Sequence, residues 1–175
     1  MMIPRRDATL LSATLIFFSL STPGLAAAQT APQTSATLKV TGDVRTPLSL
    51  SPAELAGMPR KHVEIKDEDG RTVAYDGVLV GEILKRAGAT LGSDMRGNAV
   101  ATYVVATATD GYQVVFSLAE LDPAFTGSEV IVADTVDGKP LFAYQGPLRI
   151  VAPKDTRAAR SIRMLERLEV VRLKM

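Results

Sequence analysis

The sequence predicts an α+β domain with mixed or antiparallel β-sheets and a few short helices. Short runs rich in β-branched residues recur along the chain, and turn dipeptides such as Asp137-Gly138 separate some of them. Helix signals are brief and scattered between these runs. Because the runs outnumber the helix signals and often come in hairpins, an alternating β-α arrangement is not expected.

The N-terminal residues are predicted to lie outside this domain. A positively charged start, an apolar stretch over residues 8–20 and small residues up to Ala28 are typical of a signal peptide spanning residues 1–28. The stretch is shorter than the roughly 20 residues that a membrane span needs. Residues 29–36 have the composition of a disordered tether. We therefore expect an exported, periplasmic protein with one domain at residues 37–175.

Composition excludes several classes of partner and site. Cleavage after Ala28 removes two arginines and one aspartate from 20 basic and 19 acidic side chains, which leaves 18 of each. A chain without net charge does not suggest a nucleic acid as partner. The sequence has no cysteine, so packing alone must hold the exported domain. Its length suits a single core, and we expect a monomer.

The first part of the domain reads as strands around one helix. Residues 38–40 alternate as a short strand. Ser51 opens a capping box with proline at the first helical position, which predicts a short helix. Residues 61–66 alternate, the segment 67–70 is a hairpin turn, and residues 71–75 form the return strand.

The middle of the chain contains the strongest helix signal. Residues 79–87 place apolar side chains on one face, and Gly88 is suited to the C-terminal cap. Two β-rich runs follow at residues 103–108 and 112–116. Ser117 begins a second capping box, which predicts one helical turn.

The last third carries the most informative stretch. Residues 130–136 are β-branched and end at a tight-turn dipeptide, and residues 148–152 form a second apolar run. Arg149 lies inside that run, where an ionised group needs an anion or a carboxylate. Residues 161–174 fit helical spacing and strand alternation equally, so periodicity leaves this segment open.

Several motifs resemble the sulfite-oxidase-like molybdopterin-binding domain family. The first is DGKPLFAYQGPLRIVAP, which is followed by RSIRMLERLEV. The second lies upstream and is YDGV followed by ILKRAG, where Tyr75 replaces a tryptophan of the family. The third is the central DGY at Asp110. The similarity extends over residues 38–173. It implies that family's fold, and it favours a strand in the open segment at 161–174.

The resemblance also implies a molybdopterin cofactor, but not its usual metal chemistry. Catalytic members of the family hold molybdenum through one cysteine thiolate, placed before the W-x-G-V motif. The matching region here, residues 62–74, has no cysteine, nor has the rest of the chain. Molybdenum–thiolate ligation is therefore impossible. Either the pterin and phosphate alone hold the cofactor, or the ligand carries no metal. We assign no catalytic residue and no metal ligand.

The candidate ligand-binding residues combine basic side chains with those at the family motifs. Several converging arginine forks can bind phosphate, sulfate or carboxylate. Another interpretation treats the arginines as solvated, or pairs Arg163 and Arg167 with Glu166 and Glu169 across a sheet. Tyrosines at strand positions are also often packing residues. The candidates are Tyr75, Asp110, Tyr112, Arg149, Lys154, Arg160 and Arg163.

Other sites find little support. His62 is the only histidine and has no cysteine or second histidine to share a metal, so we expect an exposed strand residue. The segment 67–70 is too short for a calcium loop. No serine-nucleophile motif or phosphate-binding glycine loop is apparent.

Three functions remain open. The first is a non-catalytic module that binds a small anionic or pterin-like ligand, in an accessory or sensor role beside a membrane redox or sensor protein. The second is a molybdopterin-dependent oxidoreductase, or a subunit of one, with atypical metal coordination. The third is a structural or protein-interaction module without a small ligand.

Overall fold

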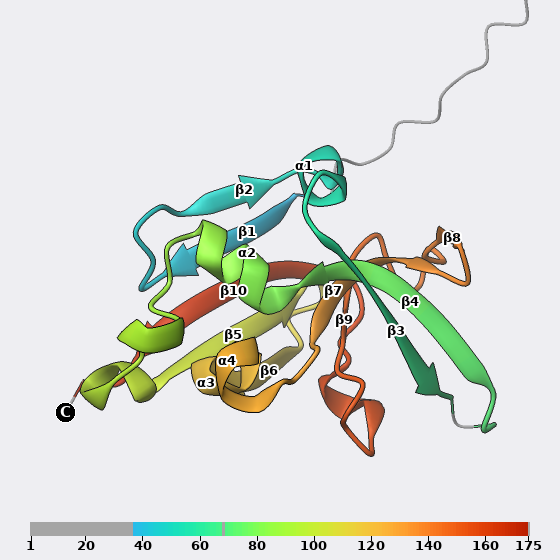
Figure 1. Cartoon of the computed structure of the whole chain (residues 1–175). Coiled ribbons are helices and arrows are strands. Elements are labelled where there is room, and N and C mark those ends of the chain that lie inside the picture. Colours follow the sequence, from blue (N-terminus) through green and yellow to red (C-terminus); the bar gives the residue numbers. More distant parts are fainter. Residues whose placement is uncertain (1–36, 68, 175) are drawn as a thin grey trace, which may run out of the picture. The chain divides into compact units, whose positions relative to one another are not determined.

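The computed structural model describes residues 37–67 and 69–174, and within these the strands form two five-stranded sheets (Figure 1). The predicted signal peptide and tether lie outside the described residues. Sheet A contains β1 (Leu38–Gly42), β2 (Leu48–Leu50), β5 (Thr102–Ala108), β6 (Gln113–Ser117) and β10 (Leu165–Arg172). Sheet B contains β3 (Arg60–Lys66), β4 (Thr72–Leu79), β7 (Ile131–Val136), β8 (Lys139–Pro140) and β9 (Arg149–Val151).

Sheet A is mixed, as the sequence predicted. Its spatial order is β2-β1-β10-β5-β6. β1 pairs in parallel with β10, with Val40 opposite Leu168, and the other neighbours are antiparallel. Residues 161–174, for which periodicity did not decide between helix and strand, therefore contain a strand. This strand lies in the middle of the sheet.

Sheet B is built from two hairpins and one added strand. β3, β4, β7 and β8 are antiparallel neighbours, and β9 pairs with β7. Gly77 allows β4 to approach β7, because a Cβ atom there would lie only 2.7 Å from the Cα atom of Ala133. At the β7–β8 turn, Asp137 and Gly138 both have positive φ, as the dipeptide predicted.

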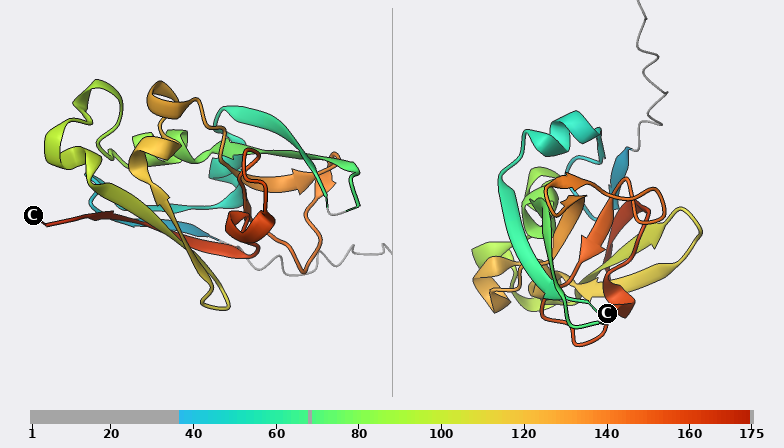
Figure 2. Two further views of the ribbon diagram at one scale, coloured as in Figure 1. Left: turned by 90° about the horizontal axis from the view of Figure 1, so that it is seen from below. Right: turned by 90° about the vertical axis from the view of Figure 1, so that its right-hand side faces the viewer.

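Short helices cover one face of sheet A (Figures 1 and 2). They are α1 (Pro52–Ala56), α2 (Val80–Arg86), α3 (Leu118–Leu121) and α4 (Pro123–Thr126). The chain also forms the 3-10 turns η1 (Gly92–Asp94), η2 (Gly97–Val100) and η3 (Ala158–Arg160). The capping box at Ser51 forms in full. No helix among the described residues is long and apolar enough to cross a membrane.

The second predicted capping box forms only in part. The Ser117 hydroxyl accepts from the backbone N–H of Glu120 at 3.1 Å. The Glu120 carboxylate does not complete the box; instead it pairs with Arg160. α4 was not predicted, although Asp122 caps it and Pro123 occupies its first turn.

Two apolar clusters lie on opposite faces of sheet B, because successive strand residues point to opposite sides. Val132 and Ile150 belong to the main core, which packs sheet A against the helices. Their neighbours Ile131 and Val151 belong to a smaller cluster that also includes Tyr75. Arg149 is two residues from Val151, so it points to the side of the smaller cluster.

Candidate functional site

The structure divides most of the predicted ligand-binding residues between two clusters. We call the first the Arg149 cluster; it comprises Tyr75, Tyr144, Gln145, Arg149 and Arg163. We call the second the Arg160 cluster; it comprises Phe116, Glu120, Asp155 and Arg160. The predicted basic residues therefore do not converge on one point.

Arg149 is buried in the first cluster, with a side chain only 5% exposed. Its Nη1 donates to the Tyr75 hydroxyl at 3.0 Å, and its Nη2 donates to the carbonyl oxygen of Ser161 at 3.2 Å. The guanidinium carbon lies 4.9 Å from the centroid of the Tyr75 ring. The tyrosine that replaces the family's tryptophan thus supplies a hydroxyl acceptor and an aromatic face.

The charge of Arg149 is not compensated within the described residues. It forms no ion pair there, and its buried Nε has no acceptor. Burial lowers the pKa of the guanidinium, while nearby Tyr75 raises this pKa and the positive charge of Arg163 lowers it further. Because arginine stays protonated in proteins, the result is a buried cation without a neutralising anion.

Exposed side chains form the outer part of this cluster. The guanidinium carbon of Arg163 lies 5.5 Å from the centroid of the Tyr144 ring. Phe142 stacks on Tyr144 at 5.7 Å with an interplanar angle of 11°, and both rings are more than half exposed. Gln145 donates to the Tyr144 hydroxyl at 3.2 Å, and its buried Oε1 has no partner in the described part of the chain. A flat aromatic surface therefore adjoins two arginines.

The Arg160 cluster is neutralised internally. Arg160 donates from Nε and Nη2 to the Asp155 carboxylate, at 2.8 and 2.7 Å. Its Nη1 and Nη2 lie 3.2 and 2.8 Å from the Glu120 oxygens. These bonds, with Asp155 first and Glu120 second, raise the pKa of Arg160. Its guanidinium also covers the Phe116 ring at 4.7 Å. The guanidinium of Arg160 therefore has no pair of free N–H donors with which to bind a ligand.

Lys154 lies beside the Arg160 cluster. Together with Arg157 and Arg160 it lines a depression of about 390 Å³. Its Nζ donates to the carbonyl oxygen of Gly127 at 2.9 Å, which ties this loop to the end of α4.

Asp110 and Tyr112 occupy the β5–β6 turn. The Asp110 carboxylate accepts from the backbone N–H of Tyr112 at 2.9 Å, a bond that shapes the turn. The ring of Tyr112 is 52% exposed, and its hydroxyl donates to the carbonyl oxygen of Ala159 at 3.2 Å. These two residues therefore border the Arg160 side, not the Arg149 cluster.

The alternative interpretation paired Arg163 and Arg167 with glutamates across a sheet. These ion pairs do not form among the described residues. Glu166 pairs with Lys39 at 3.5 Å. Arg167 leaves its buried Nε without a partner, and Arg163 contacts Tyr144.

His62 is an exposed strand residue, as expected. Its Nδ1 lies 2.8 Å from the Asp76 carboxylate across the β3–β4 hairpin. This hydrogen bond is the main cause of a raised pKa at His62.

Sequence reasoning did not single out Phe142 or Gln145. Both lie in the FAYQGP segment of the motif that resembles the family, and neither was assigned a role. Residues 143–145 form a turn in which the backbone N–H of Gln145 donates to the carbonyl oxygen of Phe142, so strand alternation could not have predicted the stacking of Phe142 on Tyr144. Nothing in the sequence marks the unpaired Oε1 of Gln145.

The residues present do not fit a molybdenum centre of the usual thiolate type. The chain has no cysteine, so it offers no soft ligand. Within the described ranges, no three His, Asp or Glu side chains are grouped to hold a metal ion. We therefore derive no chemical step through a metal.

Comparisons with known proteins agree with this fold. No curated protein matches the sequence. The structure is similar to the sulfane dehydrogenase SoxCD from Paracoccus pantotrophus, with a TM-score of 0.61 and 18% identity over 77% of this chain. The match covers only 37% of the SoxCD chain. The profile of the oxidoreductase molybdopterin binding domain matches residues 61–174. This chain belongs to the oxidoreductase molybdopterin binding domain family.

Proposed function

We propose that this chain is a non-catalytic member of its family that binds a small anionic, pterin-like ligand at the Arg149 cluster. The observation that carries the proposal is the buried Arg149, which has no carboxylate partner among the described residues and lies next to the exposed Arg163. An unpaired buried charge is costly, so a bound anion that neutralises it gains free energy.

The exposed aromatic pair supports a planar ligand. Tyr144 and Phe142 are both more than half exposed, and Arg163 lies over the Tyr144 ring. A flat heteroaromatic ring that carries a carboxylate or phosphate can pack against an aromatic side chain while its anionic group reaches the guanidinium of Arg163. The buried Arg149 does not contact the ring of the ligand; its fixed positive charge attracts the anionic group of the ligand.

Family membership favours the alternative of an oxidoreductase or one of its subunits. That alternative needs a metal ligand set unlike the thiolate of the family, because the sequence supplies no cysteine. We therefore place catalysis second.

We further propose that the chain works in the periplasm as a monomer. The charged and apolar pattern of residues 1–28 supports export. An accessory role would place it beside a membrane redox or sensor protein.

The first experiment measures what the natively purified, exported protein carries. Elemental analysis for molybdenum runs alongside the fluorescence of released, oxidised pterin. We expect no stoichiometric molybdenum. Molybdenum and pterin in near-equal amounts would overturn the non-catalytic proposal and support the alternative.

The second experiment tests the site with pterin-6-carboxylate, and uses neutral pterin as the matched probe. We expect the anion to bind about tenfold more tightly than pterin. Arg163→Gln should remove this preference, whereas Arg157→Gln, an exposed arginine beside η3, should keep it. Equal affinity for the two probes, or a preference that survives in Arg163→Gln, contradicts the site.

A further inference from the structure

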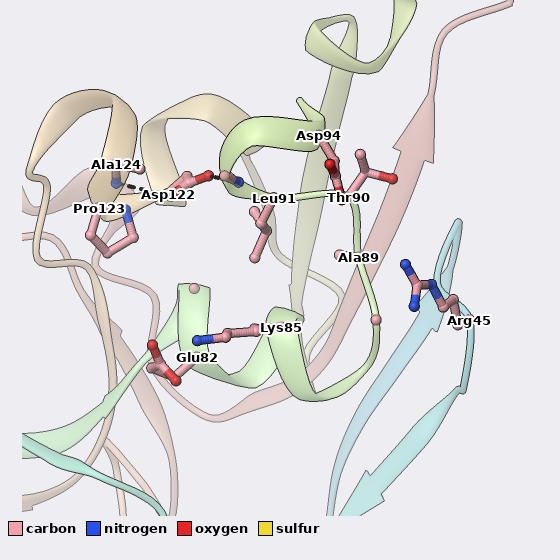
Figure 3. A pocket seen from close by; sticks show the side chains of 13 residues that line it. Arg45, Glu82, Lys85, Ala89, Thr90, Leu91, Asp94, Asp122, Pro123 and Ala124 are labelled. Carbon is pink, nitrogen blue, oxygen red and sulfur yellow. Dashed lines mark hydrogen bonds between the residues drawn. The ribbon is translucent and has the colours of Figure 1, made fainter. Parts of the chain in front are cut away.

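A cavity of about 640 Å³ opens beside α2 and shares no residue with the two arginine clusters (Figure 3). Its walls come from α2, from the loop at residues 88–94, from the α3–α4 junction at residues 122–124, and from Arg45 in the β1–β2 turn. This volume is typical of sites for small molecules, which measure roughly 300–1,000 Å³.

Hydrogen bonds hold these walls together before any ligand binds. The buried Asp122 carboxylate accepts from the backbone N–H groups of Gly92 and Ala124, and so joins the loop to α4. The backbone N–H of Thr46 donates to the carbonyl oxygen of Ala87 at 3.0 Å, which fixes the β1–β2 turn against α2. A preformed site binds with less entropy loss than a flexible one.

Five charged side chains line the cavity. The Asp122 carboxylate already accepts two backbone hydrogen bonds. Of the other four, Arg45 and Lys85 are cations, and Glu82 and Asp94 are anions. Among the described residues, none of these four side chains forms a hydrogen bond or an ion pair. In Figure 3, Lys85 extends from α2, while Asp94 belongs to the loop on the opposite side of the cavity.

The lining also has an apolar part. Figure 3 shows the Leu91 side chain directed into the cavity, which Pro123 and Ala89 also line. Gly88 allows Arg45 to pack closely against the end of α2, because a Cβ atom there would lie 2.8 Å from the Arg45 Cβ.

We propose that this cavity binds a short zwitterionic peptide. Lys85 receives the peptide carboxylate, Asp94 receives the ammonium group, and Leu91 contacts an apolar side chain. Among the described residues, the charges of the four unpaired side chains of the lining cancel, so a ligand of one sign would leave its charge uncompensated, whereas a zwitterion meets an opposite charge at each end. The proposal does not depend on the function proposed for the Arg149 cluster.

The test compares three probes by titration calorimetry on the purified protein. Alanyl-leucine carries both charges, N-acetyl-alanyl-leucine lacks the ammonium, and alanyl-leucinamide lacks the carboxylate. We expect alanyl-leucine to bind with a dissociation constant of about 1 mM or tighter, and each single-charge analogue to bind about tenfold more weakly.

Two variants assign the charges. Lys85→Met should weaken alanyl-leucine and N-acetyl-alanyl-leucine about tenfold and leave the amide unchanged, whereas Asp94→Asn should weaken alanyl-leucine and the amide and leave the acetylated probe unchanged. Lys139→Met, an exposed lysine on β8, should change nothing. No binding of alanyl-leucine, equal binding of all three probes, or the same effect of both cavity variants on every probe overturns the proposal.

Discussion

Arg149 and Arg160 have similar aromatic contacts and opposite electrostatic surroundings. Their guanidinium carbons lie 4.9 and 4.7 Å from the centroids of Tyr75 and Phe116. Arg160 has two carboxylate partners and a raised pKa. Arg149 has a hydroxyl and a carbonyl as partners, and a lowered pKa.

This difference separates a structural arginine from a candidate ligand-binding one. The ion pairs of Arg160 connect α3 to the loop before η3, and they satisfy the charge within the fold. The charge of Arg149 is a cost to the fold unless something else neutralises it. Substitution of Arg160 should therefore mainly lower the stability of the fold, whereas substitution of Arg149 should mainly weaken ligand binding.

The largest effect on stability should come from Arg160→Met. The change leaves the Asp155 and Glu120 carboxylates without their shared cation, and we expect the free energy of unfolding to fall by about 2 kcal/mol, because both carboxylates are only partly buried. Urea unfolding measures it. Arg157→Met is the control, expected to stay within about 0.5 kcal/mol of the parent. If the two variants unfold alike, the Arg160 cluster does not stabilise the fold.

Glu120→Gln should have a smaller effect. It removes one charge from the cluster and leaves Asp155 on Arg160, so we expect a loss of about 1 kcal/mol in the free energy of unfolding. The same change made in Arg160→Met should cost less, because the cation is already absent. Fully additive losses in this double-mutant cycle would show that Glu120 and Arg160 are not coupled.

Arg149→Met should change stability less than Arg160→Met does. The substitution removes a desolvated cation and its repulsion by Arg163, but it also leaves the Tyr75 hydroxyl without its donor. We expect these effects to cancel to within about 1 kcal/mol, while binding of pterin-6-carboxylate is lost. Urea unfolding and fluorescence titration measure the two quantities. A loss of stability like that of Arg160→Met would make Arg149 structural.

His62 extends the comparison to a pair that is largely open to solvent, with the side chains of His62 and Asp76 56% and 35% exposed, so the effect should be smallest. Its hydrogen bond with Asp76 raises the pKa of the imidazole above its usual 6.5. The protonated ring therefore favours the folded state at pH values below the unfolded-state pKa, and this contribution is lost as pH rises through the folded-state pKa. A proton NMR titration follows the single imidazole directly. Asp76→Asn should lower its pKa, and an unchanged midpoint contradicts the assignment.

Local signals predicted most of the individual elements. The capping box at Ser51, the cap at Gly88 and the turn at Asp137 each have a side-chain or backbone reason that acts within a few residues. α4 was missed because four residues are too few to show periodicity. The division into two sheets could not be predicted either, since it depends on pairings between distant strands.

The candidate site was predictable only in part, for the same reason. The apolar run around Arg149 indicated a buried cation, and the structure confirms that burial. The partners of Arg160 could not be read from the sequence, because Glu120 lies 40 positions away and local logic assigned it to the Ser117 cap. Whether Tyr75, Arg149 and Arg163 bind a ligand stays a prediction.

The parallel pairing of β1 with β10 sets the order in which this chain can fold. The central strand of sheet A is the last one to be synthesised, so β1 and β5 lack a common neighbour until nearly the whole domain is available. Strand pairings between distant segments also form slowly, because the loop-closure entropy must be overcome first. A chain that is exported, as we propose for this one, gains time before it folds from such a topology.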